Sequence, residues 1–216
     1  KFLTNSDTEV VVNAYMYFGS KAFNYFDGMW SIAIYDILNK SLILSRDYVG
    51  QKPLFYTKNN NYYIFSSQLD GLFVDKKSSM KISKKNLKKY YAYSYVPSPN
   101  TLFENVFQVE PGENIKINAE SLNIEKNKYW DLNNGADFNI FFEKTSKENF
   151  NVEFKKIIDQ HSIADKKPAL SLSGGLDSYL VMDYFTKAQD NITSFTLGFN
   201  NKTFDESDYV KKINKK

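Results

Sequence analysis

The segment 168–178, Pro-Ala-Leu-Ser-Leu-Ser-Gly-Gly-Leu-Asp-Ser, places two glycines, two serines and a carboxylate between an apolar run and an amphipathic run. Gly174 and Gly175 lack Cβ atoms, so the backbone can turn sharply there and approach a ligand closely. The unpaired N–H groups and the dipole of the helix that follows favour an anion at the turn, most often a phosphate. Ser173 and Ser178 add hydroxyl donors. We therefore predict a phosphate site at this turn.

Asp177 lies inside the same turn, and a carboxylate beside a phosphate makes chemical sense when a divalent cation bridges the two. An ordinary loop is the alternative interpretation, because Ser-Gly-Gly is common in turns and Asp-Ser is common at helix starts. The complete string Ser-Gly-Gly-Leu-Asp-Ser, between a predicted strand and a predicted helix, favours the phosphate site. It is not a Walker-type loop, since no Gly-Lys-Ser/Thr follows.

The amino-acid composition argues against several classes of partner and of catalytic group. The 216 residues include 28 basic and 25 acidic side chains, a balance that argues against nucleic acid or an anionic membrane as partner. No apolar run approaches the length of a membrane span, and no signal-peptide pattern opens the chain. Cysteine is absent, which excludes a thiol nucleophile in these residues and favours a reducing, cytoplasmic setting. The single histidine, His161, is expected to be a helix cap or a surface residue.

The first part of the chain reads as short strands separated by polar turns. The expected strands are 29–35, 41–45, 53–56, 62–66, 113–118 and 124–130. Their close spacing leaves no room for crossover helices, so antiparallel pairing is expected. Two helices are predicted beside them. One covers 10–18 after a capping-box pattern at Ser6–Glu9 and ends at Gly19, and the other covers 83–93 with Ser83 as N-cap.

The last part of the chain has a different character. Apolar residues between 150 and 161 recur at helical spacing. A strand over 169–173, a helix over 177–188 and a strand over 193–199 then form a βαβ unit, which requires parallel strands. We therefore expect one domain at 1–132, a linker at 133–146 and a second domain at 147–216.

Several segments carry a family resemblance by their order and spacing. They are Thr4–Glu9, Phe26–Asp36, Arg46–Tyr56 (Arg-Asp-Tyr-Val-Gly-Gln-Lys-Pro-Leu-Phe-Tyr), Tyr95–Pro99, Tyr129-Trp130, Ser173–Ser178 and Ser194–Phe199. Together they resemble the glutamine-hydrolysing asparagine synthetases. The resemblance implies an α+β, antiparallel, layered glutaminase-type (Ntn-like) domain, of which 1–132 is the C-terminal part. The start of an α/β parallel-sheet ATP-pyrophosphatase domain follows.

The resemblance also implies two coupled reactions. An N-terminal cysteine hydrolyses glutamine, and the ammonia passes to the second domain. There ATP and Mg²⁺ activate a carboxylate as an acyl-adenylate, which ammonia converts to an amide. The implied substrates are glutamine, ATP and a carboxylate, with aspartate as the first expectation.

Particular residues acquire roles only through this resemblance. Asp7 is implied to bind the α-ammonium of glutamine, with a helix-start acid as the alternative. Asp177 is implied to hold Mg²⁺ through pyrophosphate. Leu172 and Leu197 are implied to contact adenine, although both also suit a strand core. The implied ATP and pyrophosphate site is therefore Leu172, Ser173, Gly174, Gly175, Leu176, Asp177, Ser178 and Leu197.

The sequence also departs from the family pattern. The cysteine nucleophile is absent, so we assign no catalytic residue and expect an internal fragment that is inactive by itself. Three alternatives stay open: a sister amidotransferase acting on another carboxylate, such as one on a sugar; a different ATP pyrophosphatase; and a non-catalytic nucleotide-binding remnant. We expect no nucleic-acid or membrane partner, and a homodimer of the full-length protein stays open.

Overall fold

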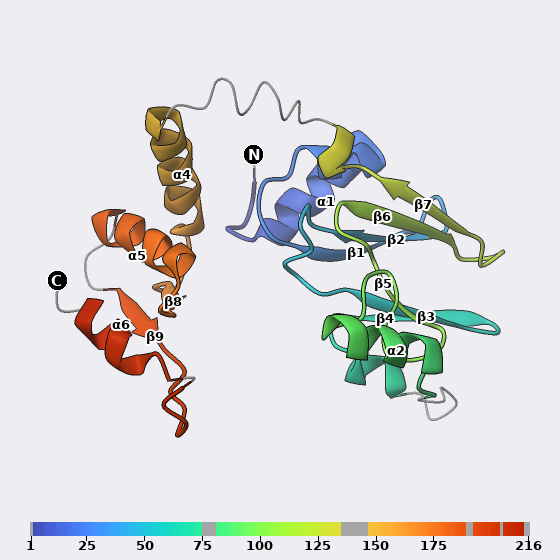
Figure 1. The fold of residues 1–216 in the computed structure, drawn as a ribbon. Coiled ribbons are helices and arrows are strands. Elements are labelled where there is room, and N and C mark those ends of the chain that lie inside the picture. The colour runs from blue at the N-terminus through green and yellow to red at the C-terminus, as the bar shows by residue number, and fades with distance from the viewer. Residues whose placement is uncertain (1, 75–80, 135–146, 189–191, 204, 214–216) are drawn as a thin grey trace. The chain divides into compact units, whose positions relative to one another are not determined.

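The computed structural model describes residues 2–74, 81–134, 147–188, 192–203 and 205–213. The chain divides into two compact units, Lys1–Ala136 and Asp137–Lys216 (Figure 1). Of the expected linker 133–146, all but residues 133 and 134 lie outside the described residues. Within the described ranges, no helix has the length and apolar character that crossing a membrane requires.

Two antiparallel sheets form the first unit, as predicted. The first sheet has the order β1-β2-β6-β7, with bounds Ser31–Asp36, Ser41–Arg46, Glu113–Asn118 and Ile124–Lys128. The second has the order β4-β3-β5, with bounds Tyr62–Ser66, Phe55–Asn59 and Val106–Gln108. β5 was not predicted, because a strand of 3 residues is too short to show an alternating pattern.

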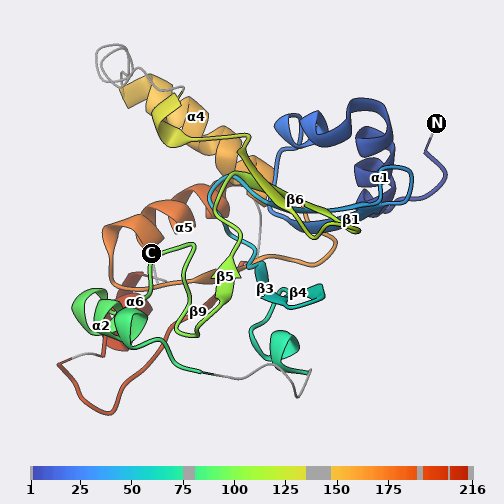
Figure 2. The ribbon, with the colours of Figure 1, turned by 90° about the vertical axis from the view of Figure 1, so that its right-hand side faces the viewer.

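Alternation along β2 places apolar side chains on both faces of the first sheet. Ile43 packs in a cluster with Phe23 and Trp30, while the next residue, Leu44, packs with Ile115 in a second cluster. α1 (Asp7–Phe18) and the short 3-10 helix η1 (Gly19–Asn24) lie on one side of this sheet, and the β4-β3-β5 sheet lies on the other (Figure 2).

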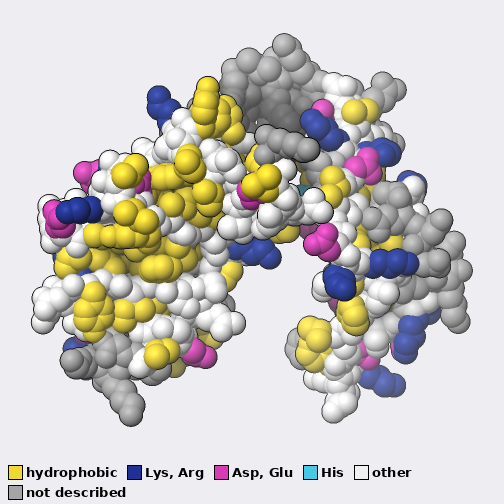
Figure 3. All heavy atoms as spheres, turned by 180° about the vertical axis from the view of Figure 1, so that it is seen from behind, with side chains coloured by type: hydrophobic (Ala, Val, Ile, Leu, Met, Phe, Trp, Pro, Cys, Tyr) yellow, Lys and Arg dark blue, Asp and Glu magenta, His cyan; other side chains and the backbone are white. Residues whose placement is uncertain are grey.

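A third cluster covers the outer face of the second sheet. Phe55, Val106 and Leu72 form it, and Leu72 comes from the 3-10 helix η2 (Asp70–Phe73). The first unit therefore has the layered, antiparallel architecture with flanking helices that the sequence predicts. Figure 3 shows apolar side chains gathered over one face of this unit, at left in that view.

The helix boundaries follow local capping, with one correction. Ser6 caps α1 by accepting a hydrogen bond from the Thr8 amide at 3.2 Å, and Gly19 ends the helix with φ 58°. The expected capping box is only half formed. The Glu9 carboxylate binds the backbone amides of Leu3 and Thr4, at 2.8 and 2.7 Å, instead of the Ser6 amide. α2 (Lys84–Tyr93) begins after Ser83, whose hydroxyl accepts from the Asn86 amide at 3.3 Å.

Arg46 and Asp47 hold the turn that follows β2. The Asp47 carboxylate is 1% exposed and accepts hydrogen bonds from the backbone amides of Gln51 and Lys52, at 2.8 and 2.9 Å. The Arg46 guanidinium donates to the carbonyl oxygens of Gly50 and Lys52, at 2.7 and 2.9 Å. Gly50 has φ +70°, and a Cβ there would lie 2.8 Å from the guanidinium carbon, so both backbone conformation and space require glycine.

The second unit contains a parallel strand pair with helices. Its elements are α4 (Lys147–His161), β8 (Ala169–Ser171), α5 (Leu176–Ala188), β9 (Thr193–Phe195) and α6 (Ser207–Ile213). β8 pairs with β9 in parallel, which confirms the pairing predicted for the two strands, although both are shorter than predicted. The α4 and α5 helices are joined by an edge-to-face contact of Phe154 with Tyr184, with ring centroids 5.0 Å apart.

Candidate functional site

The segment from Ser173 to Ser178 leads from β8 into the first turn of α5, and we call it the 173–178 loop. Its two serines hold the turn closed. The Ser178 hydroxyl accepts from the Ser173 amide at 3.2 Å and lies 3.0 Å from the carbonyl oxygens of Ser173 and Gly175. The Ser173 hydroxyl accepts from the Gly175 amide at 3.2 Å and lies 3.0 Å from the Ser178 hydroxyl. These hydroxyls therefore shape the backbone of the loop.

The glycines of the loop are explained by close approach of neighbouring atoms. A Cβ at Gly174 would lie 3.2 Å from Cδ1 of Tyr209, and one at Gly175 would lie 3.2 Å from the Ser173 hydroxyl. Either side chain would force its neighbour to shift. Neither glycine has a left-handed backbone, so space rather than φ selects glycine at both positions.

The amide of Gly174 points at an anion supplied by the protein. Its N–H donates to Oε2 of Glu206 at 2.8 Å, and Glu206 precedes the first residue of α6. This carboxylate oxygen stands in for an oxygen of an anionic ligand. The contact shows that an anionic oxygen can reach this amide, which Glu206 occupies in the structure.

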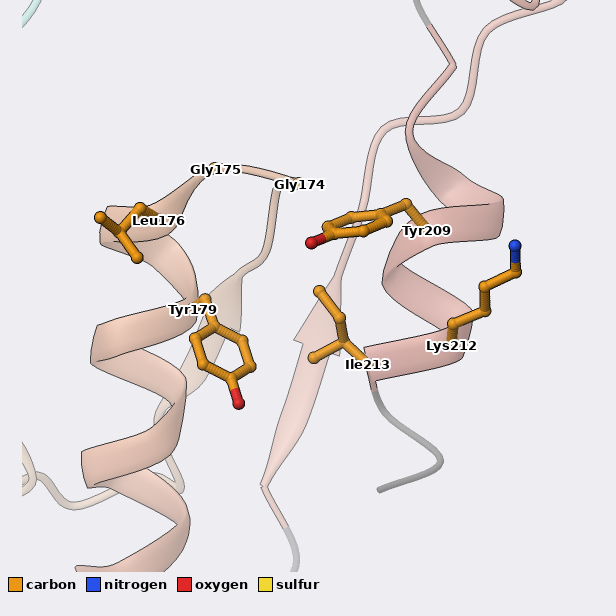
Figure 4. A pocket seen from close by; sticks show the side chains of 7 residues that line it. All are labelled: Gly174, Gly175, Leu176, Tyr179, Tyr209, Lys212 and Ile213. Atoms are coloured by element: carbon orange, nitrogen blue, oxygen red, sulfur yellow. The ribbon is translucent and has the colours of Figure 1, made fainter.

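A pocket of about 500 Å³ opens beside the loop (Figure 4). In Figure 4 the side chain of Tyr209 on α6 lies across from Gly174, and the side chain of Ile213 points toward Tyr179 on α5. The lining residues are Gly174, Gly175, Leu176, Tyr179, Tyr209, Lys212 and Ile213. The pocket thus combines loop backbone, two aromatic rings and one cationic side chain.

The other predicted residues of this site lie in different environments. Asp177 is exposed in the first turn of α5. Leu172 is 2% exposed and belongs to the core, whereas Leu176 and Leu197 are 79% and 80% exposed. The core placement of Leu172 agrees with the strand-core alternative. The two exposed leucines leave apolar surface near the loop.

The arrangement fits a nucleotide phosphate accompanied by a divalent cation. An anion acceptor already faces the Gly174 amide, the glycines allow close approach, and Asp177 is exposed beside them. Among the described residues, no three or more His, Cys, Asp or Glu side chains are grouped so that they could hold a metal. A cation at Asp177 would therefore need phosphate oxygens as further ligands, which is how Mg²⁺ is usually held in nucleotide sites.

Asp7 belongs to the first unit, where it is the first residue of α1 and is exposed. With Trp30 and Lys52 it is among the residues that line a pocket of about 490 Å³. This pocket offers one acidic and one basic side chain, a pair suited to an amino acid. His161 is exposed, and its Nδ1 lies 2.9 Å from the Ile157 carbonyl oxygen, which agrees with the expected cap or surface role.

Two features of the site were not predicted. They are the contact of Glu206 with the loop and the side chain of Tyr209 beside Gly174. The Gly174–Glu206 bond spans 32 positions, and no local pattern reports a contact at such a separation. The parallel pairing of β8 with β9 places the strand that leads into the loop beside the strand that precedes α6.

Comparison with known proteins matches both parts of the chain. Residues 1–130 match the model of the glutamine amidotransferase domain, and residues 150–216 match that of asparagine synthase. The "Putative asparagine synthetase (glutamine-hydrolyzing) 2" of Methanocaldococcus jannaschii is 32% identical over 96% of this chain and 41% of its own length. Asparagine synthetase (glutamine-hydrolyzing) 1 of Bacillus subtilis is 30% identical over 97% of this chain and 33% of its own length.

A solved structure of glutamine phosphoribosylpyrophosphate amidotransferase from Bacillus subtilis covers 98% of this chain and 44% of its own, with 16% identity and a TM-score of 0.43. The chain spans well under half the length of the curated relatives it matches, 41% of one and 33% of the other.

Proposed function

Since this chain belongs to the family of glutamine-hydrolysing asparagine synthetases, we propose that the full-length protein uses ATP to amidate a carboxylate with ammonia taken from glutamine. Aspartate is the proposed acceptor and asparagine the product. The second unit then contributes the start of an ATP-pyrophosphatase domain. The parallel β8–β9 pair followed at its edge by the 173–178 loop supports this assignment.

The observation that carries the proposal is that the Gly174 amide, two residues before α5, donates a hydrogen bond to a carboxylate oxygen. We assign the loop amides and the α5 N-terminus to the β- and γ-phosphates of ATP. Asp177 would hold Mg²⁺ together with those phosphates, and the cation would supply charge neutralisation. Ser173 and Ser178 fix the loop backbone. Leu176 and Leu197 supply exposed apolar surface, with Leu197 as contact for the adenine ring, while the buried Leu172 supports the strand beneath the loop.

The proposed reaction has two steps, in which first pyrophosphate and then AMP is the leaving group. A carboxylate oxygen of the acceptor attacks the α-phosphorus of ATP, and pyrophosphate leaves from the 173–178 loop. Ammonia then attacks the acyl carbon, AMP leaves, and the amide remains after a proton is lost. AMP is a much better leaving group than a carboxylate oxygen, and this difference is why ATP is consumed.

In the first unit, we assign Asp7 to the α-ammonium group of glutamine. Its place in the lining of the pocket that Lys52 also lines supports this assignment. The sequence contains no cysteine, so these 216 residues supply no thiol for glutamine hydrolysis. We expect the isolated chain to release no ammonia from glutamine.

The test is to incubate the full-length protein with ATP, Mg²⁺, aspartate and either glutamine or ammonium. AMP, pyrophosphate and asparagine should form in equal amounts. Formation of ADP and phosphate would contradict the proposed chemistry. AMP formation with another carboxylate, but not with aspartate, would retain the chemistry and replace the acceptor.

A further inference from the structure

The proposed phosphate loop already holds an anion that belongs to the protein. The Glu206 carboxylate accepts from the Gly174 amide at 2.8 Å, and a Cβ at Gly174 would lie 3.3 Å from the carboxylate carbon. One N–H group cannot serve this carboxylate and a phosphate oxygen equally well at the same time. A phosphate that uses the Gly174 amide must therefore displace Glu206.

The fold allows that displacement. The Glu206 side chain is exposed, and its backbone carbonyl oxygen accepts from the amides of Tyr209 and Val210 in the first turn of α6, at 3.1 and 3.0 Å. The side chain that caps α6 belongs to a different residue. Asp205 accepts from the Ser207 amide and hydroxyl at 3.1 and 2.6 Å. Hence the Glu206 carboxylate can leave Gly174 without uncapping α6.

Charge decides which ligands can cause the displacement. Asp177 in the loop and Glu206 opposite it are both carboxylates, so a metal-free polyphosphate meets repulsion as well as competition for the amide. For a polyphosphate bound to a divalent cation, both the charge repulsion and the competition for the amide are weaker. The cation offsets the ligand charge and attracts carboxylate oxygens.

We propose that Glu206 determines which anions the 173–178 loop admits: it excludes metal-free phosphates by occupying the Gly174 amide, and it yields to a phosphate that carries a divalent cation. The inference rests on the proposed function, because it presupposes that the loop binds phosphate.

The experiment measures pyrophosphate binding to the full-length protein by titration calorimetry, with and without Mg²⁺. Glu206→Gln keeps the shape of the side chain and removes its charge. It should raise the affinity for metal-free pyrophosphate about tenfold, the effect expected from losing one competing charge-assisted hydrogen bond. The affinity for magnesium pyrophosphate should change less than about threefold, because the cation already offsets the carboxylate.

Two further variants separate specific occupancy from general charge and from misfolding. Asp208→Asn removes a carboxylate two positions away whose side chain is 89% exposed and lies 3.6 Å from Lys211, and it should bind like the unmodified protein. Glu206→Ala should behave like Glu206→Gln, since both remove the competing charge. Equal gains in Asp208→Asn and Glu206→Gln would overturn the inference.

Unchanged metal-free affinity in both Glu206 variants, in a protein that binds magnesium pyrophosphate, would overturn this inference and leave the proposed function standing. If neither form of pyrophosphate binds to the unmodified protein or to a folded Glu206 variant, the 173–178 loop is not a phosphate site. The proposed function and this inference would then both be wrong.

Discussion

The hydroxyl of Tyr129 donates a hydrogen bond to the backbone carbonyl oxygen of Arg46 at 2.5 Å, across 83 positions of the chain. Tyr129 also stacks on Trp30, with ring centroids 6.1 Å apart. The segment after β7 is thereby tied to the end of β2 and to the cluster under α1. Two sequence motifs that are distant along the chain thus contact each other in the first unit.

Tyr129→Phe should lower the free energy of unfolding of the first unit by about 1–3 kcal/mol, because the ring stays while a carbonyl oxygen loses its donor. Urea unfolding monitored by tryptophan fluorescence measures this change, since both tryptophans, Trp30 and Trp130, lie in the first unit. Tyr91→Phe, at a ring that is 80% exposed, is the matched control and should be silent. Equal stability of the two variants would refute the role of the Tyr129 hydroxyl.

Asp47→Ala should cost more, about 3–5 kcal/mol, because the amides of Trp30, Gln51 and Lys52 lose a buried acceptor together. Asp47→Asn keeps one acceptor oxygen and should lie between Ala and the unmodified protein. The same urea experiment ranks the three proteins. An alanine variant as stable as the asparagine variant would show that the carboxylate oxygens do not hold this turn.

The stability of the first unit should fall in strong alkali. Burial, and then a hydrogen bond to the Asp36 carboxylate, raises the pKa of Tyr15 from 10.0 to about 12. The folded state therefore favours the neutral phenol. Its contribution is complete below about pH 10 and is lost as the pH rises toward about 12. Burial raises the pKa of Tyr129 in the same direction.

Tyr15→Phe isolates this contribution. The difference in unfolding free energy between the variant and the unmodified protein, measured from pH 8 to pH 11.5, should stay constant up to about pH 10 and shrink above it. A difference that is independent of pH throughout would contradict the assignment to Tyr15.

Ser178→Ala should weaken magnesium pyrophosphate binding about tenfold, because the hydroxyl that closes the 173–178 loop is lost and the loop must be ordered on binding. Ser171→Ala, at an exposed position of β8, is the control and should bind normally. Calorimetry with the full-length protein gives both affinities. Normal binding by Ser178→Ala would show that the loop does not need this hydroxyl.

The sequence predicted the fold well where a pattern is local. Ser83 and Gly19 mark helix ends by their own side-chain and backbone chemistry, and alternation in β2 separates the two packed faces. Features that depend on distant partners could not be predicted. β5 exists because it pairs with β3, and the Glu9 carboxylate binds Leu3 and Thr4 because the preceding backbone folds over it.

The residues of the candidate site also fall into those that a local motif identifies and those that depend on distant contacts. The glycines, serines and Asp177 of the 173–178 loop stand together in the sequence, so the motif identifies them. The contact of Glu206 with Gly174 and the place of Tyr209 in the pocket lining depend on the position of α6 beside the loop. No residue of the loop specifies that position.

The assignment of the 173–178 loop to ATP is tested most directly by assaying both half-reactions in full-length Asp177→Ala. ATP-dependent amide formation should be lost, because the pyrophosphate would lack the carboxylate that holds its cation, while glutamine hydrolysis should largely survive. Asp183→Ala, which removes a partly exposed carboxylate paired with Lys187 on the same helix, should keep both activities. Unchanged amide formation in Asp177→Ala would contradict the assignment of the 173–178 loop to ATP.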